Sequence, residues 1–206
     1  MLYFAWGINK PDIQNKRSAL IRKHWDFIDE YQERLVARGP VLEFTNTSMV
    51  LGSIHILDID NLIEAKKFVY NEPFASAGLF KSIIFHQFQN KSSRTQFEFT
   101  RNPENKTFFL YCPNSIKHKT ISNTVKKESL SYYNDFAEHI ICWGSLISDR
   151  DEELCNIFFV EFSSLDNTRI FLKNDPYSIN NHYDNPEIHR WAPGGRENLT
   201  LDGKLP

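Results

Sequence analysis

Apolar side chains in the first part of the chain recur at helical spacing between Arg17 and Leu42. A return every three or four residues predicts an α-helix with one inward stripe. The stripe consists of Leu20, His24, Phe27, Tyr31 and Leu35. Gly39 and Pro40 are expected to end this helix, because glycine and proline are common at and just after helix ends.

His24 is the polar member of this otherwise apolar or aromatic stripe. A buried imidazole needs hydrogen-bond partners, since an unpaired polar group in a protein interior costs several kcal/mol. The pattern therefore indicates a polar site beneath the long helix.

Short apolar runs around this helix predict the other elements of the first half. Strands are expected at residues 2–6, 41–44, 49–57 and 82–88. A second helix is expected from Asp60, as its capping residue, to about Val69. The resulting order, βαββαβ, is the ferredoxin-like arrangement.

The same pattern then repeats. Residues 35–42 align with residues 140–147, residues 67–74 with residues 170–177, and residues 85–88 with residues 188–191. This alignment predicts a tandem duplication. The first repeat is expected at residues 1–90 and a polar linker at residues 91–105. The second, diverged repeat with a C-terminal tail is expected at residues 106–206. Alternation in the linker at Gln96–Phe99 leaves open a short extra strand.

Composition narrows the classes of function. The chain has 206 residues, of which 41% are hydrophobic and 14% aromatic, enough for a packed core. The net charge of −2 argues against a nucleic-acid partner. Three widely spaced cysteines without a CxxC pair indicate reduced thiols in the cytoplasm. The apolar segment at residues 1–6 is too short for a signal peptide or a membrane span.

The first half contains a series of short motifs: Arg17, His24, Gly39-Pro40-Val41, Gly52-Ser53, Glu72-Pro73-Phe74 and Gly78-Leu79-Phe80. In their order and spacing these motifs are typical of the YCII-related family, which this half resembles. The sequence departs from the family pattern at Glu72, which stands in an aspartate position, and at Ile21, where a second helical arginine is common. The second half resembles the family more weakly. It keeps Gly144 and Asp175-Pro176-Tyr177 but has Ser129 in the histidine position.

The resemblance implies an α+β fold in which two ferredoxin-like sheets face each other as a dimeric α+β barrel. A duplicated chain is expected to form this barrel within itself, because each sheet has an apolar face that needs cover. The expected state is therefore a monomer with an internal pseudo-dimer, or a weak homodimer.

The resemblance also implies a dyad of His24 and Glu72, in which the carboxylate orients the imidazole and raises its basicity. Relatives are thought to use such a pair for acid–base elimination, such as loss of HCl from a chlorinated hydroquinone. The first hypothesis is therefore a lyase-like or isomerase-like enzyme for a small cyclic or aromatic compound, without a cofactor. The alternative is a non-catalytic binding or accessory protein, with His24 as a satisfied core residue beside a surface glutamate.

Other candidate residues remain open to two interpretations. Arg17 would hold a substrate anion or form an exposed salt bridge. Ser53 and His55 lie on the same side of one strand and would face the cleft or simply pack. Ser129 and Asp175 are the second-half equivalents of the dyad. No HxH or HExxH spacing supports a metal site.

Overall fold

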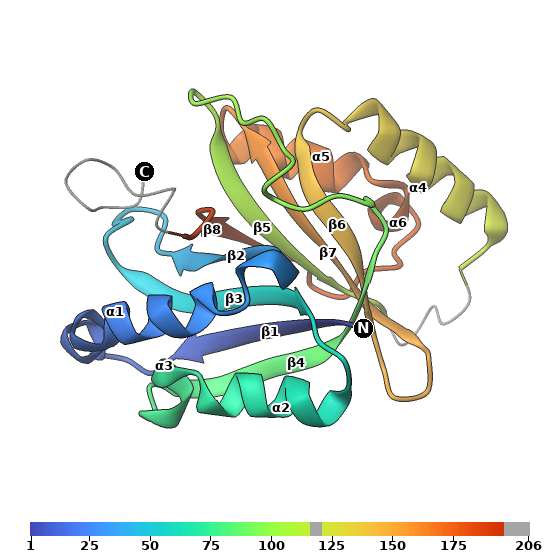
Figure 1. Cartoon of the computed structure of the whole chain (residues 1–206). Helices are drawn as coiled ribbons and strands as arrows, with labels where there is room; N and C mark the ends of the chain where they lie inside the picture. The colour runs from blue at the N-terminus through green and yellow to red at the C-terminus, as the bar shows by residue number, and fades with distance from the viewer. Residues whose placement is uncertain (116–120, 196–206) are drawn as a thin grey trace. The chain divides into compact units, whose positions relative to one another are not determined.

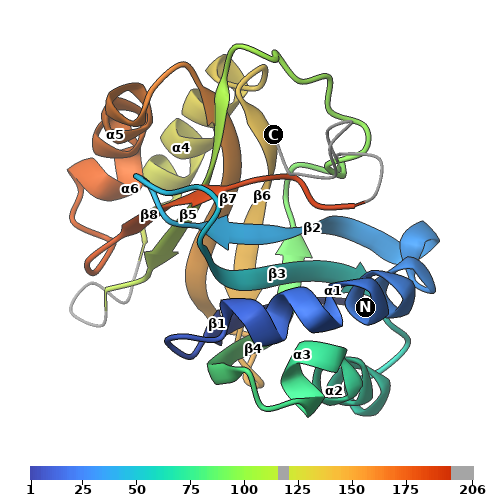
Figure 2. The same cartoon turned by 90° about the vertical axis from the view of Figure 1, so that its left-hand side faces the viewer.

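The computed structural model describes residues 1–115 and 121–195 (Figures 1 and 2). Its first half contains β1 (Leu2–Asn9), α1 (Gln14–Asp29), the 3-10 helix η1 (Gln32–Arg34), β2 (Leu35–Leu42), β3 (Val50–Asp58), α2 (Leu62–Asn71), α3 (Pro73–Ser76) and β4 (Phe80–Asn90). Its second half contains β5 (Lys106–Pro113), α4 (Asn123–Asp135), β6 (Ile140–Ile147), β7 (Glu153–Phe162), α5 (Leu165–Asn174), α6 (Pro176–Ile179) and β8 (Glu187–Trp191). The α+β class and the two βαββαβ repeats predicted from the sequence are confirmed.

The chain divides into two compact units. The first unit comprises Met1–Phe88, Thr95–Phe97 and the residues from Arg190 on, and the second comprises Gln89–Arg94 and Glu98–His189. The first unit thus includes two short segments from outside residues 1–90. Gln96 and residues 190–194 of these segments lie along β2.

The sheet of the first unit has the order β4-β1-β3-β2 with antiparallel neighbours. Helices α1, α2 and α3 lie together against one face of this sheet (Figure 1). Phe68 of α2 and Ile28 of α1 pack there with Tyr3 and Leu57 of the strands. The part of α1 that precedes Ile28 has polar buried side chains, Arg17 and His24, which lie over β3.

The predicted end of the long helix is wrong. Helix α1 ends at Asp29, and Leu35–Leu42, including Gly39 and Pro40, forms strand β2. All eight residues of β2 are buried. A strand covered on both faces shows a continuous apolar run instead of alternation, so the sequence of β2 resembles a continuing helix.

Two smaller expectations also change. Asn61, not Asp60, caps α2, because its side chain accepts hydrogen bonds from the amides of Ile63 and Glu64. Residues 96–99 form a turn and bend, not a strand. Gln96 instead uses its backbone amide to bind the carbonyl of Val36 in β2 at 2.8 Å.

The second unit repeats the strand order as β8-β5-β7-β6. Its helices α4, α5 and α6 gather on one side of the strands (Figure 2). The core is strongly aromatic, with Tyr133 of α4 and Phe171 of α5 packed on Trp143 and Phe158. Strand β6 (residues 140–147) is the segment that the sequence alignment pairs with residues 35–42, which form β2. The two segments are therefore equivalent, although residues 35–42 were expected to lie at the end of a helix.

Candidate functional site

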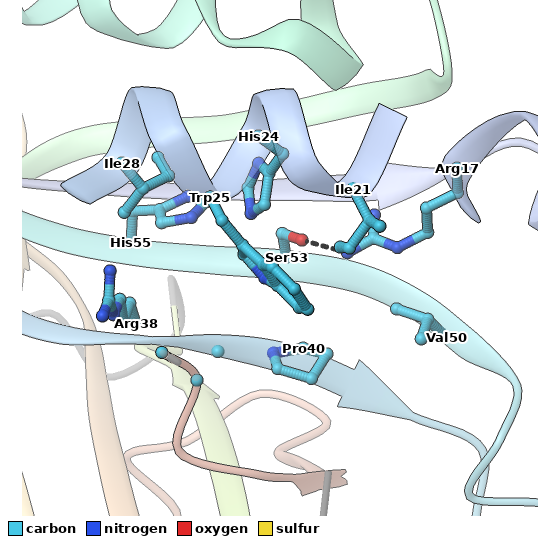
Figure 3. A pocket seen from close by; sticks show the side chains of 13 residues that line it. Arg17, Ile21, His24, Trp25, Ile28, Arg38, Pro40, Val50, Ser53 and His55 are labelled. Carbon is cyan, nitrogen blue, oxygen red and sulfur yellow. Dashed lines mark hydrogen bonds between the residues drawn. The ribbon is translucent and has the colours of Figure 1, made fainter. Parts of the chain in front are cut away.

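A pocket of about 80 Å³ opens in the first unit between α1, β2 and β3 (Figure 3). It could hold a few water-sized groups, since one water needs roughly 10–15 Å³ of such volume. Its lining is Arg17, Ile21, His24, Trp25, Ile28, Arg38, Gly39, Pro40, Val50, Ser53, His55, Gly194 and Gly195. Most of this surface is apolar, with an imidazole pair and two arginines among it.

His24 and Glu72 are hydrogen-bonded in the interior of the first unit. His24 lies on the buried side of α1, and Glu72 precedes the short helix α3. The distance from His24 Nδ1 to Glu72 Oε1 is 2.5 Å, and the two residues are 7% and 3% exposed. The longer glutamate therefore reaches the imidazole from the aspartate position of the family motif.

The surroundings of Glu72 determine which nitrogen of His24 carries the proton. Glu72 Oε1 accepts the amide of Phe74 at 3.0 Å, and Oε2 accepts the amide of Ala75 at 2.9 Å. A carboxylate with these donors is an acceptor, so His24 Nδ1 donates to it. Nε2 then has the lone pair, and no described residue binds it. This is the arrangement of a general base.

Electrostatics keep His24 neutral. Burial lowers its pKa, and the charges of Arg17 and Arg38 lower it further. The hydrogen bond and the negative charge of Glu72 act in the opposite direction. The net effect is a lowered pKa, so the imidazole is unprotonated at neutral pH and able to accept a proton.

His55 of β3 lies beside His24, with ring centroids 5.4 Å apart. Its pKa is well below the ordinary value, because burial disfavours protonation most, and the neighbouring titratable ring of His24 and the positive charges of Arg38 and Arg17 oppose it as well. His55 is thus a neutral ring in the wall of the pocket. Phe74 stacks on the other imidazole, that of His24, with centroids 4.2 Å apart.

Arg17 is buried at 6% exposure, so the alternative of an exposed salt bridge is wrong. Its guanidinium donates to Ser53 Oγ at 2.6 Å, the contact drawn in Figure 3, and lies 4.1 Å from the ring centre of Phe74. Burial lowers its pKa to about 10, although the charge of Glu72 opposes this. Arg17 remains a cation at neutral pH, and no carboxylate among the described residues forms an ion pair with it.

The far wall of the pocket comes from the other end of the chain. The amide of Gly194 donates to the carbonyl of Arg38 at 2.7 Å, and the amide of Ala192 donates to that of Pro40 at 3.2 Å. A side chain at Gly39 would collide with the carbonyl of Ala192. The glycine therefore permits the close approach of residues 192–194 to β2.

The structure brings together the predicted first-half residues, since Arg17, His24, Ser53 and His55 line one pocket. Glu72 lies behind His24 and lines a smaller adjoining cavity with Ser53 and His55. The sequence analysis missed Trp25 and Arg38 as lining residues. Trp25 follows His24 directly, and Arg38 directly precedes Gly39. This closeness to motif residues was the sequence signal that could have identified them as lining residues.

The structure does not bring Ser129 and Asp175 together as a pair. Asp175 accepts hydrogen bonds from the hydroxyls of Tyr133 at 3.0 Å and Tyr183 at 2.9 Å, and from the amide of Tyr177 at 3.0 Å. Burial raises its pKa to about 6, although these three donors oppose the shift. Asp175 thus caps α6 and anchors two tyrosines.

No group of three or more His, Cys, Asp or Glu side chains in residues 1–115 and 121–195 is arranged to hold a metal ion. In the same ranges, no helix is both long and apolar enough to cross a membrane.

The fold and the site define an α+β protein that has a buried histidine–carboxylate pair beside a pocket under its first helix. Residues 1–89 match the family model described as the YCII-related domain. This match covers the first repeat, the part of the chain whose motifs resemble the same family. A search of curated proteins finds no match for the chain.

Solved structures match one repeat or nearly the whole chain. The dehydrochlorinase for 5-chloro-2-hydroxyhydroquinone from Burkholderia phenoliruptrix AC1100 is 24% identical over 46% of this chain and 99% of its own, with a TM-score of 0.42. A protein from Lactobacillus acidophilus NCFM, provisionally assigned as a monooxygenase, is 9% identical over 93% of this chain and 92% of its own, with a TM-score of 0.56. A chlorite dismutase variant from Candidatus Nitrospira defluvii is 7% identical over the same shares, with a TM-score of 0.59. None of these three likenesses indicates more than the fold, and the fold is indicated by the last two, whose TM-scores are 0.56 and 0.59.

Proposed function

We propose that the first repeat is the catalytic half of a small-molecule enzyme that uses His24 and Glu72 for acid–base chemistry. The observation that supports this most directly is the 2.5 Å hydrogen bond between His24 Nδ1 and Glu72 Oε1 beside a pocket. The family match over residues 1–89 supports the same proposal. The reaction class is proton abstraction, leading to elimination or isomerisation.

In the proposed step, His24 Nε2 removes a proton from a carbon next to a carbonyl carbon of the substrate. The electron pair of that C–H bond forms a C=C bond. In isomerisation, the C=O π electrons move onto the carbonyl oxygen and give an enolate; in elimination, the bond from the neighbouring carbon to a leaving group such as chloride breaks, and chloride departs with its electron pair. Glu72 stabilises the imidazolium that forms at His24. Arg17 stabilises the negative charge that develops on the substrate oxygen, as a preorganised cation does in a water-poor site.

The lining of the pocket supports a small ring compound with an oxyanion or a polarised oxygen as substrate. Arg17 supplies a cation that no carboxylate in the described part of the chain pairs with, and Trp25, Pro40 and Ile21 supply flat or aliphatic surface (Figure 3). Ser53 orients Arg17 through its hydroxyl. His55, neutral and buried, is proposed to shape the pocket and to donate or accept a hydrogen bond to the ring substituents.

The test is a screen of chlorinated hydroquinones and cyclic enones, starting with 5-chloro-2-hydroxyhydroquinone. Chloride release and proton exchange with deuterated solvent are measured. For an active compound, His24→Ala should lower turnover about 10²–10⁴-fold, the usual size of a general acid–base contribution. The matched control is His189→Ala, because His189 also pairs with a glutamate, at 2.8 Å from Glu187, but lies outside the pocket lining.

Two outcomes decide between the enzyme and its alternative. A folded His24→Ala protein with full activity would exclude His24 as the base. Saturable binding of ring compounds without turnover of any would instead support the non-catalytic binding protein.

A further inference from the structure

The second unit contains a pocket of its own, of about 140 Å³, which is larger than the pocket of the first unit. It lies between α4, β6 and the start of α6. Its lining is Lys91, Lys126, Ser129, Leu130, Tyr133, Trp143, Glu153 and Tyr177. No residue here can serve as the imidazole base of the first repeat, so this pocket is independent of the proposed catalysis.

Ser129 gives the pocket an unsatisfied polar group. The residue is 1% exposed, and its hydroxyl has no hydrogen-bond partner among the described residues. A buried hydroxyl without a partner costs about 1–3 kcal/mol. Because Ser129 lines the cavity, a bound molecule with a polar oxygen would satisfy this hydroxyl, which both donates and accepts.

Lys126 adds a positive charge to the same side of α4. It lies one helical turn before Ser129, so the two side chains share a face of the helix. No described carboxylate pairs with Lys126, whereas the other lysine of the lining, Lys91, is paired with Glu153 at 2.5 Å. The ammonium and the hydroxyl therefore favour one anionic oxygen group between them.

The remaining wall is aromatic and firmly held. Trp143 stacks on Phe158 at 5.6 Å between ring centroids and meets Tyr133 at 4.6 Å. The hydroxyl of Tyr133 is fixed by Asp175. Trp143, Tyr133 and Tyr177 are 7%, 3% and 5% exposed, so packing holds these rings in place where they line the pocket. The ammonium of Lys91 lies 5.7 Å from the centre of the Trp143 ring.

We propose that this pocket binds a small aromatic molecule that carries an anionic oxygen group, such as a benzoate. Its acidic oxygen lies against Ser129 and Lys126, and its ring lies against the aromatic wall. The replacement of the family histidine by Ser129 thus converts the second repeat from a catalytic site into a binding site. This inference does not depend on activity in the first repeat.

The probe is 4-fluorobenzoate, and its binding is followed by fluorine NMR line broadening. Arg17→Gln serves as the background for all variants, because Arg17 gives the first pocket a cation that also attracts anions. In that background, Ser129→Ala should weaken binding about tenfold, as the loss of a hydrogen bond to a charged group predicts. Lys126→Gln should weaken it about threefold and reduce its salt dependence. The matched control, Lys127→Gln, replaces an exposed lysine outside the pocket lining. It should change neither the affinity for 4-fluorobenzoate nor the salt dependence of binding.

The uncharged analogue 4-fluorobenzyl alcohol should bind more weakly than the benzoate and should respond to Ser129→Ala alone. Circular dichroism verifies that each variant is folded. Three results would overturn the proposal: no saturable binding at millimolar ligand, binding that Arg17→Gln abolishes, or binding that neither Ser129→Ala nor Lys126→Gln weakens.

Discussion

The two repeats place a carboxylate at the same point of the fold and use it differently. Glu72 and Asp175 each cap the short helix that follows them. Glu72 accepts the amides of Phe74 and Ala75, and Asp175 accepts the amide of Tyr177. In the first repeat the carboxylate also binds the imidazole of His24. In the second it binds the hydroxyls of Tyr133 and Tyr183.

This difference separates a structural role from a chemical one. Capping is common to both repeats, so it explains why an acidic residue stands there without any reaction. Only in the first repeat does the acid face an imidazole, whose pKa is lowered by burial so that its neutral form can accept a proton. The tyrosines of the second repeat have a pKa well above the ordinary value, because burial and the charge of Asp175 disfavour ionisation, and they cannot serve as bases at neutral pH.

The largest expected effect comes from Glu72→Gln, which keeps the shape of Glu72 and removes its charge. If the glutamine oxygen takes the place of Oε2, it still accepts the amide of Ala75, and the NH₂ group takes the place of Oε1, where it faces His24 Nδ1 and no longer accepts the amide of Phe74. Nδ1 becomes the acceptor, Nε2 carries the proton, and the base is lost. Turnover should fall about 10²–10³-fold, and nitrogen-15 NMR should show the changed tautomer. In the matched control, Glu187→Gln at the pair with His189, turnover should not change.

Next in size is the pH dependence of stability that Asp175 introduces. Its pKa, about 6 in the folded chain, is above the ordinary value of 3.8. Folding therefore favours the protonated acid, so its stabilising contribution is complete below the ordinary pKa and is lost as pH rises through about 6. A displacement of this size corresponds to about 3 kcal/mol.

Asp175→Asn tests this comparison directly. Asparagine keeps the acceptor for Tyr177 and does not titrate, so the free energy of unfolding of the variant should fall less between pH 4 and pH 6 than that of the unchanged chain. Urea unfolding across this range measures the difference. Identical pH profiles for the two proteins would show that Asp175 is not the group responsible.

A smaller effect is expected from Gly39→Ala, a variant that should change ligand binding in the first pocket and not in the second. The new methyl group would collide with the carbonyl of Ala192, so residues 192–194 must move away from β2. Overpacking of this kind costs about 1–3 kcal/mol, which thermal unfolding would register. Ligand binding in the first pocket should weaken because Gly194 lines it, while 4-fluorobenzoate binding in the Arg17→Gln background should persist. Equal loss in both pockets would mean that the change acts through general destabilisation.

The sequence predicted the parts of this molecule that local pattern determines. The βαββαβ order, the inward position of His24 and the alignment of Glu72 with Asp175 all follow from periodicity and short motifs. The start of β2 at Leu35 did not, because a strand buried on both faces has no alternation. The wall formed by Gly194 depends on a contact between residues far apart in the chain, which no local pattern encodes.

The smallest expected effect, and the sharpest test of the comparison, is Glu72→Asp. Asp175 shows that an aspartate can cap the short helix, since it accepts the amide of Tyr177 at 3.0 Å. The shorter side chain retracts the carboxylate by about 1.5 Å, which lengthens the present 2.5 Å contact with His24 Nδ1 unless α3 moves closer. The pKa of His24 should fall further, because the hydrogen bond and the charge that now raise it are weakened. Turnover should drop several-fold, and the acidic limb of its pH profile should shift to lower pH, a change that a purely structural role would not produce. A drop as large as that of Glu72→Gln would instead mean that capping by Glu72, and not its bond to His24, holds the pocket together.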